Sequence, residues 1–211
     1  MKFFRCMLVL WGLCAGMAQA QTVLERLLLA AQDNNLAMVR ETVGRGMPAD
    51  TVDSAGNSLL MIAARFGHVE MARLLLEFKA NIQHRNAVGD TPLMFAAIGG
   101  NVAVARLLVD RGAKVNHPGW TPLHYCAAGG KAAVCQFLLD RDADIDARSP
   151  NGTTALMLAV GEGHFEVVKL LIWEVADVAA RNDDGVTALM WAVRGKRADM
   201  VGLLKQAGAK E

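Results

Sequence analysis

The chain has 211 residues, and 53% of them are hydrophobic, which is enough for a substantial buried core. Its 22 lysines and arginines nearly balance 21 aspartates and glutamates, for a formal net charge of +1. Nucleic-acid-binding proteins concentrate positive charge on one face to hold phosphates, so this composition excludes nucleic acid as the expected partner. No proline- or serine-rich linker divides the chain after its first residues, and we expect one folded domain.

Residues 1–20 have the pattern of a secretory signal peptide. Lys2 and Arg5 precede the apolar stretch MLVLWGLCAGMA, and residues 18–20 form an A-x-A cleavage site. The apolar run over residues 6–18 is shorter than the roughly 20 residues of a membrane-spanning helix, so a membrane anchor is the less favoured alternative. We expect cleavage after residue 20, export to a compartment such as a bacterial periplasm, and no stable membrane insertion afterwards.

Cleavage would leave residues 21–211 as one domain with 20 basic and 21 acidic side chains. Cys126 and Cys135 remain in this part, in a compartment that is oxidising. Two cysteines are too few for the disulfide framework that replaces a core in small secreted domains. We therefore expect burial of apolar side chains to stabilise the domain.

Five related tetrapeptides divide the domain into units. SLLM, TPLM, TPLH, TALM and TALM recur at spacings of 33, 30, 33 and 33 residues, with their third residues at Leu60, Leu93, Leu123, Leu156 and Leu189. A nearly fixed period of this length indicates a stacked array of repeats. Such an array has one long continuous surface and no deep crevice for catalytic groups, so binding is the expected activity.

The unit GDTPLMFAAIGGNVAVARLLVDRGAKVN shows how each repeat is built. Thr91 is a favourable N-cap, and Pro92 suits the first helical position, where no backbone N–H is needed. Gly100 and Gly112 suit the left-handed residue that closes a helix. The second helix carries apolar residues at positions 102, 104, 105, 107 and 108, a spacing that gives one broad buried face. Each unit is predicted to be a helix pair with a glycine break.

These units resemble the ankyrin repeat. The best matches are WTPLHYCAAGG, beginning at Trp120, and NGTTALMLAVGEGHFEVVKLLI, beginning at Asn151, and the resemblance covers essentially all of residues 21–211. It implies an all-α solenoid of about six stacked antiparallel helix pairs, with hairpin fingers and a concave binding face. Glu41 and Lys205 replace apolar residues of the inner units, so the first and last units are expected to be caps with polar outer faces.

The glycine that closes the second helix is replaced in three units, by Lys79, Asp142 and Val175. A β-branched residue adopts the left-handed conformation poorly. We expect neutral variation in a tolerant loop, with a locally altered helix end at Val175 as the alternative.

The spacing of 30 residues indicates that one finger lacks three residues. Only His117 and Pro118 remain between Asn116 and Gly119. A short finger between longer ones leaves a notch and exposes Trp120. Large aromatic side chains often anchor interfaces, and Trp120 is either such an anchor or a cover over the gap.

The sequence lacks the HExxH motif of metalloproteases, a serine nucleophile elbow and a phosphate-binding P-loop, so we expect no catalysis, cofactor or bound metal. The stretch GEGHFE, which begins at Gly161, falls on the break between two helices. His124 matches the histidine of the family's TPLH motif, which hydrogen-bonds locally.

Sulfur-containing side chains permit a second interpretation. One methionine recurs at the same place in four units: Met61, Met94, Met157 and Met190. Flexible methionines fill gaps in a core well, and a stripe of soft metal ligands is the less favoured alternative. Cys126 and Cys135 lie on the two helices of one unit, where we expect two buried thiols, with a disulfide as the alternative.

The resemblance also implies which residues contact a target, namely those after the small pair of the first helix and those at the finger tips. Carried onto this chain, these positions include Arg65, Phe66, Val88, Asp90, Ile98, Trp120, Asn151, Glu162, Asp184 and Arg194. Phe66, Val88, Ile98 and Trp120 are expected to form an apolar patch of the kind that marks a protein interface. The alternative is that Phe66 and Ile98 lean on the preceding helix and are half-buried.

The sequence therefore predicts a non-enzymatic, exported scaffold that binds one partner protein on its concave face and is a monomer by itself. An inhibitor of a toxic protein, of the immunity type, is a second version of this function. The alternative of a different class is an accessory protein in metal or oxidative-stress handling, with the methionines, Cys126 and Cys135 as ligands or oxidisable groups.

Overall fold

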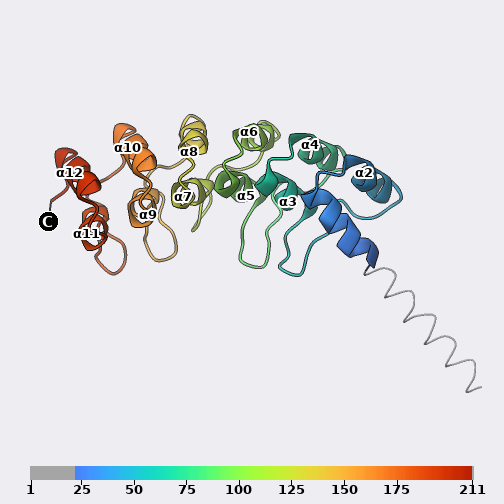
Figure 1. Ribbon diagram of the computed structural model, residues 1–211, viewed down its shortest axis with the longest axis horizontal. Coiled ribbons are helices and arrows are strands. Elements are labelled where there is room, and N and C mark those ends of the chain that lie inside the picture. Colours follow the sequence, from blue (N-terminus) through green and yellow to red (C-terminus); the bar gives the residue numbers. More distant parts are fainter. Residues whose placement is uncertain (1–21, 211) are drawn as a thin grey trace, which may run out of the picture.

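The computed structural model describes residues 22–210, and they form a row of antiparallel helix pairs (Figure 1). The predicted signal peptide, residues 1–20, lies outside the described residues. The first pair consists of helical residues 22–32 and α2 (Leu36–Gly44). The following pairs are α3 (Leu59–Phe66) with α4 (Val69–Glu77), α5 (Pro92–Gly99) with α6 (Val102–Asp110), α7 (Pro122–Ala128) with α8 (Ala132–Leu139), α9 (Ala155–Glu162) with α10 (Phe165–Trp173), and α11 (Ala188–Arg194) with α12 (Ala198–Gln206).

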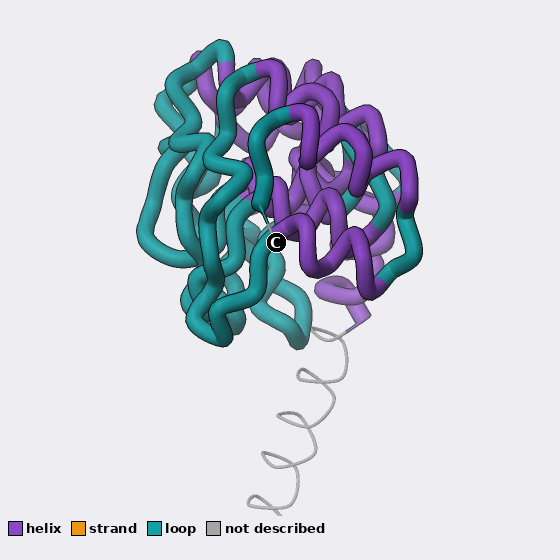
Figure 2. Tube along the Cα trace, turned by 90° about the vertical axis from the view of Figure 1, so that its left-hand side faces the viewer, coloured by secondary structure: helices purple, strands orange, loops and turns teal. Residues whose placement is uncertain are grey.

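The helices form two layers, and the connections between pairs form a third. The second helices, α4, α6, α8, α10 and α12, lie along one edge of the row, and the first helices, α3, α5, α7, α9 and α11, lie beside them (Figure 1). The loops that join one pair to the next project away from the helices on the opposite side (Figure 2). This arrangement confirms the predicted all-α solenoid with hairpin fingers.

Local sequence signals fix the helix ends as predicted. The hydroxyl of Thr91 accepts the backbone N–H of Met94 at 3.4 Å, and Pro92 is the first residue of α5. Gly100 closes the same helix with a φ of 77°, in the left-handed region that a glycine adopts without strain. The sequence therefore determines where α5 begins and ends without help from the neighbouring repeats.

The recurrent methionine belongs to the core in three of the four units, and Met190 of the last unit is only partly buried. Met61, Met94 and Met157 are buried, and the sulfur of Met94 accepts the backbone N–H of Thr91 at 3.3 Å. In the TPLH unit the Nδ1 of His124 accepts the N–H of Thr121 at 3.1 Å in the same way. Methionine and histidine are thus alternative acceptors for the first N–H of these helices.

One side chain in most repeats ties that repeat to the one before it. Each lies at the start of a second helix and reaches the carbonyl oxygens that end the preceding first helix. The bonds run from His68 Nε2 to Gln32, Asn101 Nδ2 to Ala64 and Arg65, His164 Nε2 to Ala128, and Arg197 Nη1 to Val160. Carbonyl groups at the end of a helix lack the usual partner one turn further on, so these bonds help to satisfy them and connect neighbouring repeats.

Cys126 on α7 and Cys135 on α8 form a disulfide. The expectation of two buried thiols is therefore wrong, and the alternative of a bond across the helix pair is correct. The two Cα atoms lie 5.6 Å apart, within the usual range for a disulfide. Ala96 and Ala105 occupy the equivalent buried positions of the preceding repeat, so small side chains there let the two helices approach closely.

The residues that replace the closing glycine keep its conformation. Lys79, Asp142 and Val175 have φ values of 65°, 61° and 66°. The backbone N–H of Ala176 bonds to Leu171 at 2.9 Å, and that of Ala143 bonds to Leu138 at 3.0 Å. Val175 therefore does not alter its helix end, and it holds a left-handed conformation that is strained for a β-branched residue.

Candidate functional site

The fingers differ in length at the middle of the row. They span residues 45–58, 78–91, 111–121, 140–154 and 174–187, and the third is the short one that the spacing of the tetrapeptides predicts (Figure 1). Its turn still contains a glycine in the left-handed region, Gly119, with a φ of 80°. The missing residues therefore shorten the finger without removing its turn.

The first two fingers are bonded to each other. The side chain of Asn86 donates to the Oδ1 of Asn57 at 2.8 Å, and the backbone N–H of Ala87 donates to the carbonyl of Ala55 at 3.2 Å. His84 Nε2 lies 2.8 Å from the carbonyl oxygen of Gly56. These contacts hold the two fingers as one surface.

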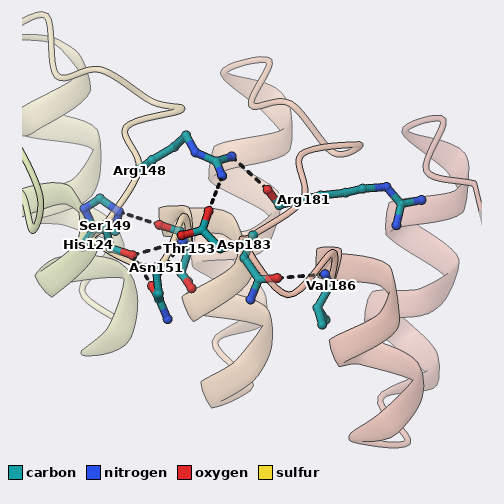
Figure 3. Close-up of polar contacts among 9 residues, drawn as sticks. His124, Arg148, Ser149, Asn151, Thr153, Arg181, Asp183 and Val186 are labelled. Atoms are coloured by element: carbon teal, nitrogen blue, oxygen red, sulfur yellow. Dashed lines mark hydrogen bonds and ion pairs between the residues drawn. The ribbon is translucent and has the colours of Figure 1, made fainter.

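The last two fingers are bonded in a similar way (Figure 3). The guanidinium of Arg148 donates to the carbonyl of Arg181 at 2.9 Å and to the carboxylate of Asp183 at 3.2 Å. The backbone N–H of Asp183 also donates to the carbonyl of Asn151 at 3.1 Å. The Arg148–Asp183 ion pair is about half exposed to solvent, so its main effect is on the geometry of the fingers.

The short finger lies between these two bonded pairs. Arg85 of the second finger donates to the Nδ1 of His117 at 3.0 Å, and the side chain of Asn116 donates to the carbonyl of Asp142 at 2.7 Å. Burial, and then the positive charges of Arg85 and Lys114, lower the pKa of His117 below its ordinary value. The imidazole is therefore neutral at neutral pH, which allows Nδ1 to accept the Arg85 N–H.

A hollow of about 230 Å³ opens where the short finger leaves space. Its lining comes from α5, the short finger and α7: Ile98, Trp120, His124, Tyr125 and Ala128. Trp120 is 40% exposed, and its ring meets the rings of His124 and Tyr125 edge-on, with centroid separations of 5.4 and 6.2 Å. Trp120 thus covers part of the gap and stays partly exposed, and its role as an interface anchor stays a prediction.

The base of the hollow is held by a neutral histidine. Because Nδ1 of His124 accepts the Thr121 N–H, its proton is on Nε2, which donates to the carbonyl of Thr153 at 3.0 Å. Burial lowers the pKa of His124, against a smaller opposing effect of its hydrogen bonds to Thr153 and Ala147. His124 thus supports the wall of the hollow and links two repeats, which is the local role implied by the TPLH motif.

A tyrosine and an aspartate form the polar rim. The hydroxyl of Tyr125 on α7 donates to the carboxylate of Asp90 in the second finger. Burial, and then this hydrogen bond and the negative charge of Asp90, raise the pKa of Tyr125 far above its ordinary value. The hydroxyl therefore stays protonated, and the pair fixes the finger against α7 beside the hollow.

The structure brings together two of the four residues of the predicted apolar patch. Ile98 is half-buried and lines the hollow with Trp120, whereas Phe66 and Val88 do not line it. Phe66 is 53% exposed and stacks on His68 with a centroid separation of 5.9 Å, and Val88 is 79% exposed on its finger. Half-burial, the alternative for Phe66 and Ile98, therefore applies to Ile98 alone.

The charged and polar candidates are spread along the row. Arg65 is exposed at the end of α3, with its guanidinium 6.0 Å from the centroid of the Phe95 ring. Four more candidates are exposed on later repeats and lie away from the hollow: Asn151, Glu162, Asp184 and Arg194. The side chain of Asn151 accepts the hydroxyl of Ser149 at 2.6 Å, so part of its bonding capacity is used within the finger.

Tyr125 is the functional residue that the sequence interpretation missed. It occupies the position after the TPLH histidine, where two of the other repeats have Phe95 and Trp191 and two have Ile62 and Leu158. The signal in the sequence is that this position on the first helices is aromatic in three of five repeats. Its contact with Asp90 depends on how α7 sits against the second finger, which the repeat pattern alone does not specify.

The metal-handling alternative gains no support from residues 22–210. Three of the four recurrent methionines are buried in separate repeats, and the two cysteines are bonded to each other. In this part of the chain, no three His, Cys, Asp or Glu side chains cluster in a way that could hold a metal ion. Among the same residues, no helix has both the length and the apolar character that crossing a membrane requires.

Stacked helix pairs and projecting fingers define the class of protein, which is a repeat solenoid. A family model described as ankyrin repeats (3 copies) matches residues 27–118, 80–149 and 123–211. The chain belongs to the ankyrin repeat family. Ankyrin repeats are in general protein–protein interaction modules, which agrees with a binding role. A search of curated proteins found no match to this chain.

Proposed function

We propose that this protein is a non-enzymatic scaffold, exported from the cytoplasm, that binds a partner protein on the surface formed by the first helices and the fingers. The hollow beside Trp120 is the observation that carries the proposal. It is apolar on its walls, carries a fixed polar rim at Asp90 and Tyr125, and is open to solvent. One apolar side chain of a partner would fill a space of this size.

The hollow has the features of an interface anchor point. The Trp120 ring contacts the rings of His124 and Tyr125 before a partner arrives, so little side-chain entropy of Trp120 is lost on binding. Aromatic residues in such pockets commonly contribute 2 kcal/mol or more to binding, whereas rim contacts contribute little. Exposed charges on both sides, such as Arg65 and Glu162, would then select the partner and its orientation.

Site-specific crosslinking tests this proposal. A photoreactive phenylalanine analogue at Phe66, on the first-helix side, should give a discrete adduct with a partner in living cells. The same analogue at Arg40, exposed on the outer helix α2, is the matched control. The adduct at position 66 should disappear in Ala128→Arg, which fills the hollow, and in Trp120→Asp, with helical content by circular dichroism unchanged. Persistence of the adduct in both variants would exclude the hollow as the binding site.

Export rests on the signal-like residues 1–20 and is supported by the disulfide, because such bonds persist in oxidising compartments. Intact mass measurement of protein recovered from the periplasmic fraction should show a chain that begins at Gln21. Full-length protein confined to the cytosolic fraction would contradict export. Identification of the crosslinked partner then decides between a scaffold and an immunity-type inhibitor, a distinction that stays a prediction.

A further inference from the structure

Two apolar residues protrude from the outer row of helices. Trp173, the last residue of α10, is 83% exposed, and Val175, just after it, is 82% exposed. At the position of Trp173 the other inner repeats have Glu77, Asp110 and Asp140. The position of Val175 is otherwise occupied by glycine, lysine or aspartate, and Val175 holds a strained left-handed conformation there. Both residues therefore depart from the pattern of the other inner repeats.

A groove of about 460 Å³ lies beside Trp173, between α8 and α10. Ala132, Ala133 and Leu170 provide its apolar lining, and Trp173 flanks it. The groove exists because α8 has alanines where α10 has the larger Phe165 and Glu166. The outer patch, defined as Trp173, Val175 and this groove, thus combines a protruding aromatic ring with an apolar depression of its own.

The outer patch is separate from the surface of the proposed function. Trp173 and the groove lie on the second helices α8 and α10, and Val175 is at the start of the finger just after α10, whereas the fingers project away from these helices (Figures 1 and 2). A partner seated in the hollow beside Trp120 would therefore leave the outer patch uncovered. Exposed apolar residues of this kind are costly to leave in water and mark an interaction surface.

We propose that a second copy of this chain covers the outer patch, with the Trp173 of each copy inserted into the groove of the other. A two-fold interface uses the same patch on both copies and so requires that patch to be self-complementary. A protruding ring next to an apolar groove meets this requirement in shape. This match in shape between the ring and the groove favours a second copy of the chain over an unrelated partner.

The charges around the groove also suit a two-fold contact. Glu166 and Lys169, both on α10, form an ion pair of 3.3 Å on the groove wall. With both signs on one wall, a two-fold partner can place its Lys169 against Glu166 and its Glu166 against Lys169, so like charges need not meet. At the other side of the groove, Gln136 donates to the carboxylate of Glu174 at 3.1 Å, which fixes α8 against the end of α10.

This assembly replaces the expected monomer with a dimer in which the hollow beside Trp120 of each copy stays open. Two binding faces on one particle would engage a multivalent or clustered partner more tightly than a single face does. Dimer formation itself does not depend on the hollow beside Trp120. An experiment can therefore refute dimer formation without refuting partner binding at the hollow, and the reverse.

Sedimentation velocity of the purified protein over about 1 to 100 µM tests the dimer. The wild-type protein should show a concentration-dependent dimer, and Trp173→Asp should raise its dissociation constant on the order of thirtyfold. Trp120→Asp is the matched control, because it adds the same charge in place of the same residue on the other face, and it should still dimerise. Trp173 is mostly exposed, so its replacement should leave the circular dichroism spectrum unchanged.

A charge exchange gives a second, independent measurement. Glu166→Lys alone should weaken the dimer, and Glu166→Lys combined with Lys169→Glu should restore it. A wild-type protein that is monomeric over the whole range would overturn the proposal, as would a dimer that Trp173→Asp leaves intact. A monomer whose tryptophan emission shifts with anionic lipid vesicles, but not in Trp173→Asp, would also overturn it and assign the patch to a membrane surface.

Discussion

Reduction of the Cys126–Cys135 disulfide is expected to lower the free energy of unfolding by about 2.6 kcal/mol. The two cysteines are 9 residues apart in sequence. In the chain-entropy description, closing a loop of this size removes about 2.6 kcal/mol of conformational freedom from the unfolded state at 25 °C. For a domain of this length, such a change corresponds to a fall in Tm of roughly 5–10 °C.

Urea denaturation followed by circular dichroism, with and without a phosphine reductant, measures this difference. The matched control is Cys126→Ala combined with Cys135→Ala, which restores the residue pair found at Ala96 and Ala105. The control should have the stability of the reduced protein and should not respond to reductant. Because both cysteines are fully buried, reduction has to be carried out on the unfolded chain before refolding.

Two outcomes would refute this reasoning. Thiol labelling of the unfolded, unreduced protein should find no reactive thiol in residues 22–210, and two reactive thiols would show that the bond is not formed. Equal urea midpoints in oxidised and reduced wild-type protein would show that the bond forms but does not constrain the unfolded chain.

Two further predictions concern single side chains. Burial lowers the pKa of His124 below 6.5, its ordinary value, so at low pH the unfolded chain binds a proton that the folded chain does not. The free energy of unfolding is therefore expected to fall as the pH drops below about 6.5, by up to about 1.4 kcal/mol per pH unit. The pKa of His117 is also lowered, so His117 adds a dependence of stability on pH of the same sign. The measurement is therefore the difference between wild type and His124→Met in the slope of unfolding free energy against pH, from urea titrations at several pH values. Equal slopes in the two proteins would contradict the prediction for His124. Lys79→Gly is expected to raise stability by on the order of 1 kcal/mol, because Lys79 has a φ of 65°, which glycine adopts without strain. Gly112→Lys should lower stability for the same reason. Thermal melts that move in the opposite directions would show that the left-handed conformation costs nothing here.

The sequence predicts the parts of the fold that depend on nearby residues. The start of α5 at Pro92 and its end at Gly100 follow from the chemistry of caps, and the short finger follows from counting residues between tetrapeptides. The exposure of Trp120 follows in turn, since no finger residues remain to cover it. These predictions hold because each needs only the period of the repeat and the properties of a few side chains.

The parts that the sequence does not predict depend on distances between helices. Whether Cys126 reaches Cys135 is decided by the separation of α7 and α8, and small buried residues occupy those positions in either redox state. The bond from Tyr125 to Asp90 depends on how a finger lies against a helix of the next repeat. Trp173 could have been found from the sequence, because aligning the repeats shows a tryptophan where the other inner repeats have an acidic residue. The resemblance to ankyrin repeats directs the search for binding residues to the concave face, and Trp173 lies outside that set.

The third inner repeat combines features that are separate in its neighbours. Its finger is the short one, its helices carry the disulfide, and its first helix supplies His124 and Tyr125 to the hollow. The short finger keeps a bond to each neighbouring finger, between Arg85 and His117 on one side and between Asn116 and Asp142 on the other, and the hollow lies beside it. The covalent bond between α7 and α8 stabilises the same repeat, since it restricts the unfolded chain and does not depend on finger contacts. The disulfide therefore joins the two helices of this repeat, and the His124 bond to Thr153 joins it to the next repeat, beside the hollow that we propose as the binding site.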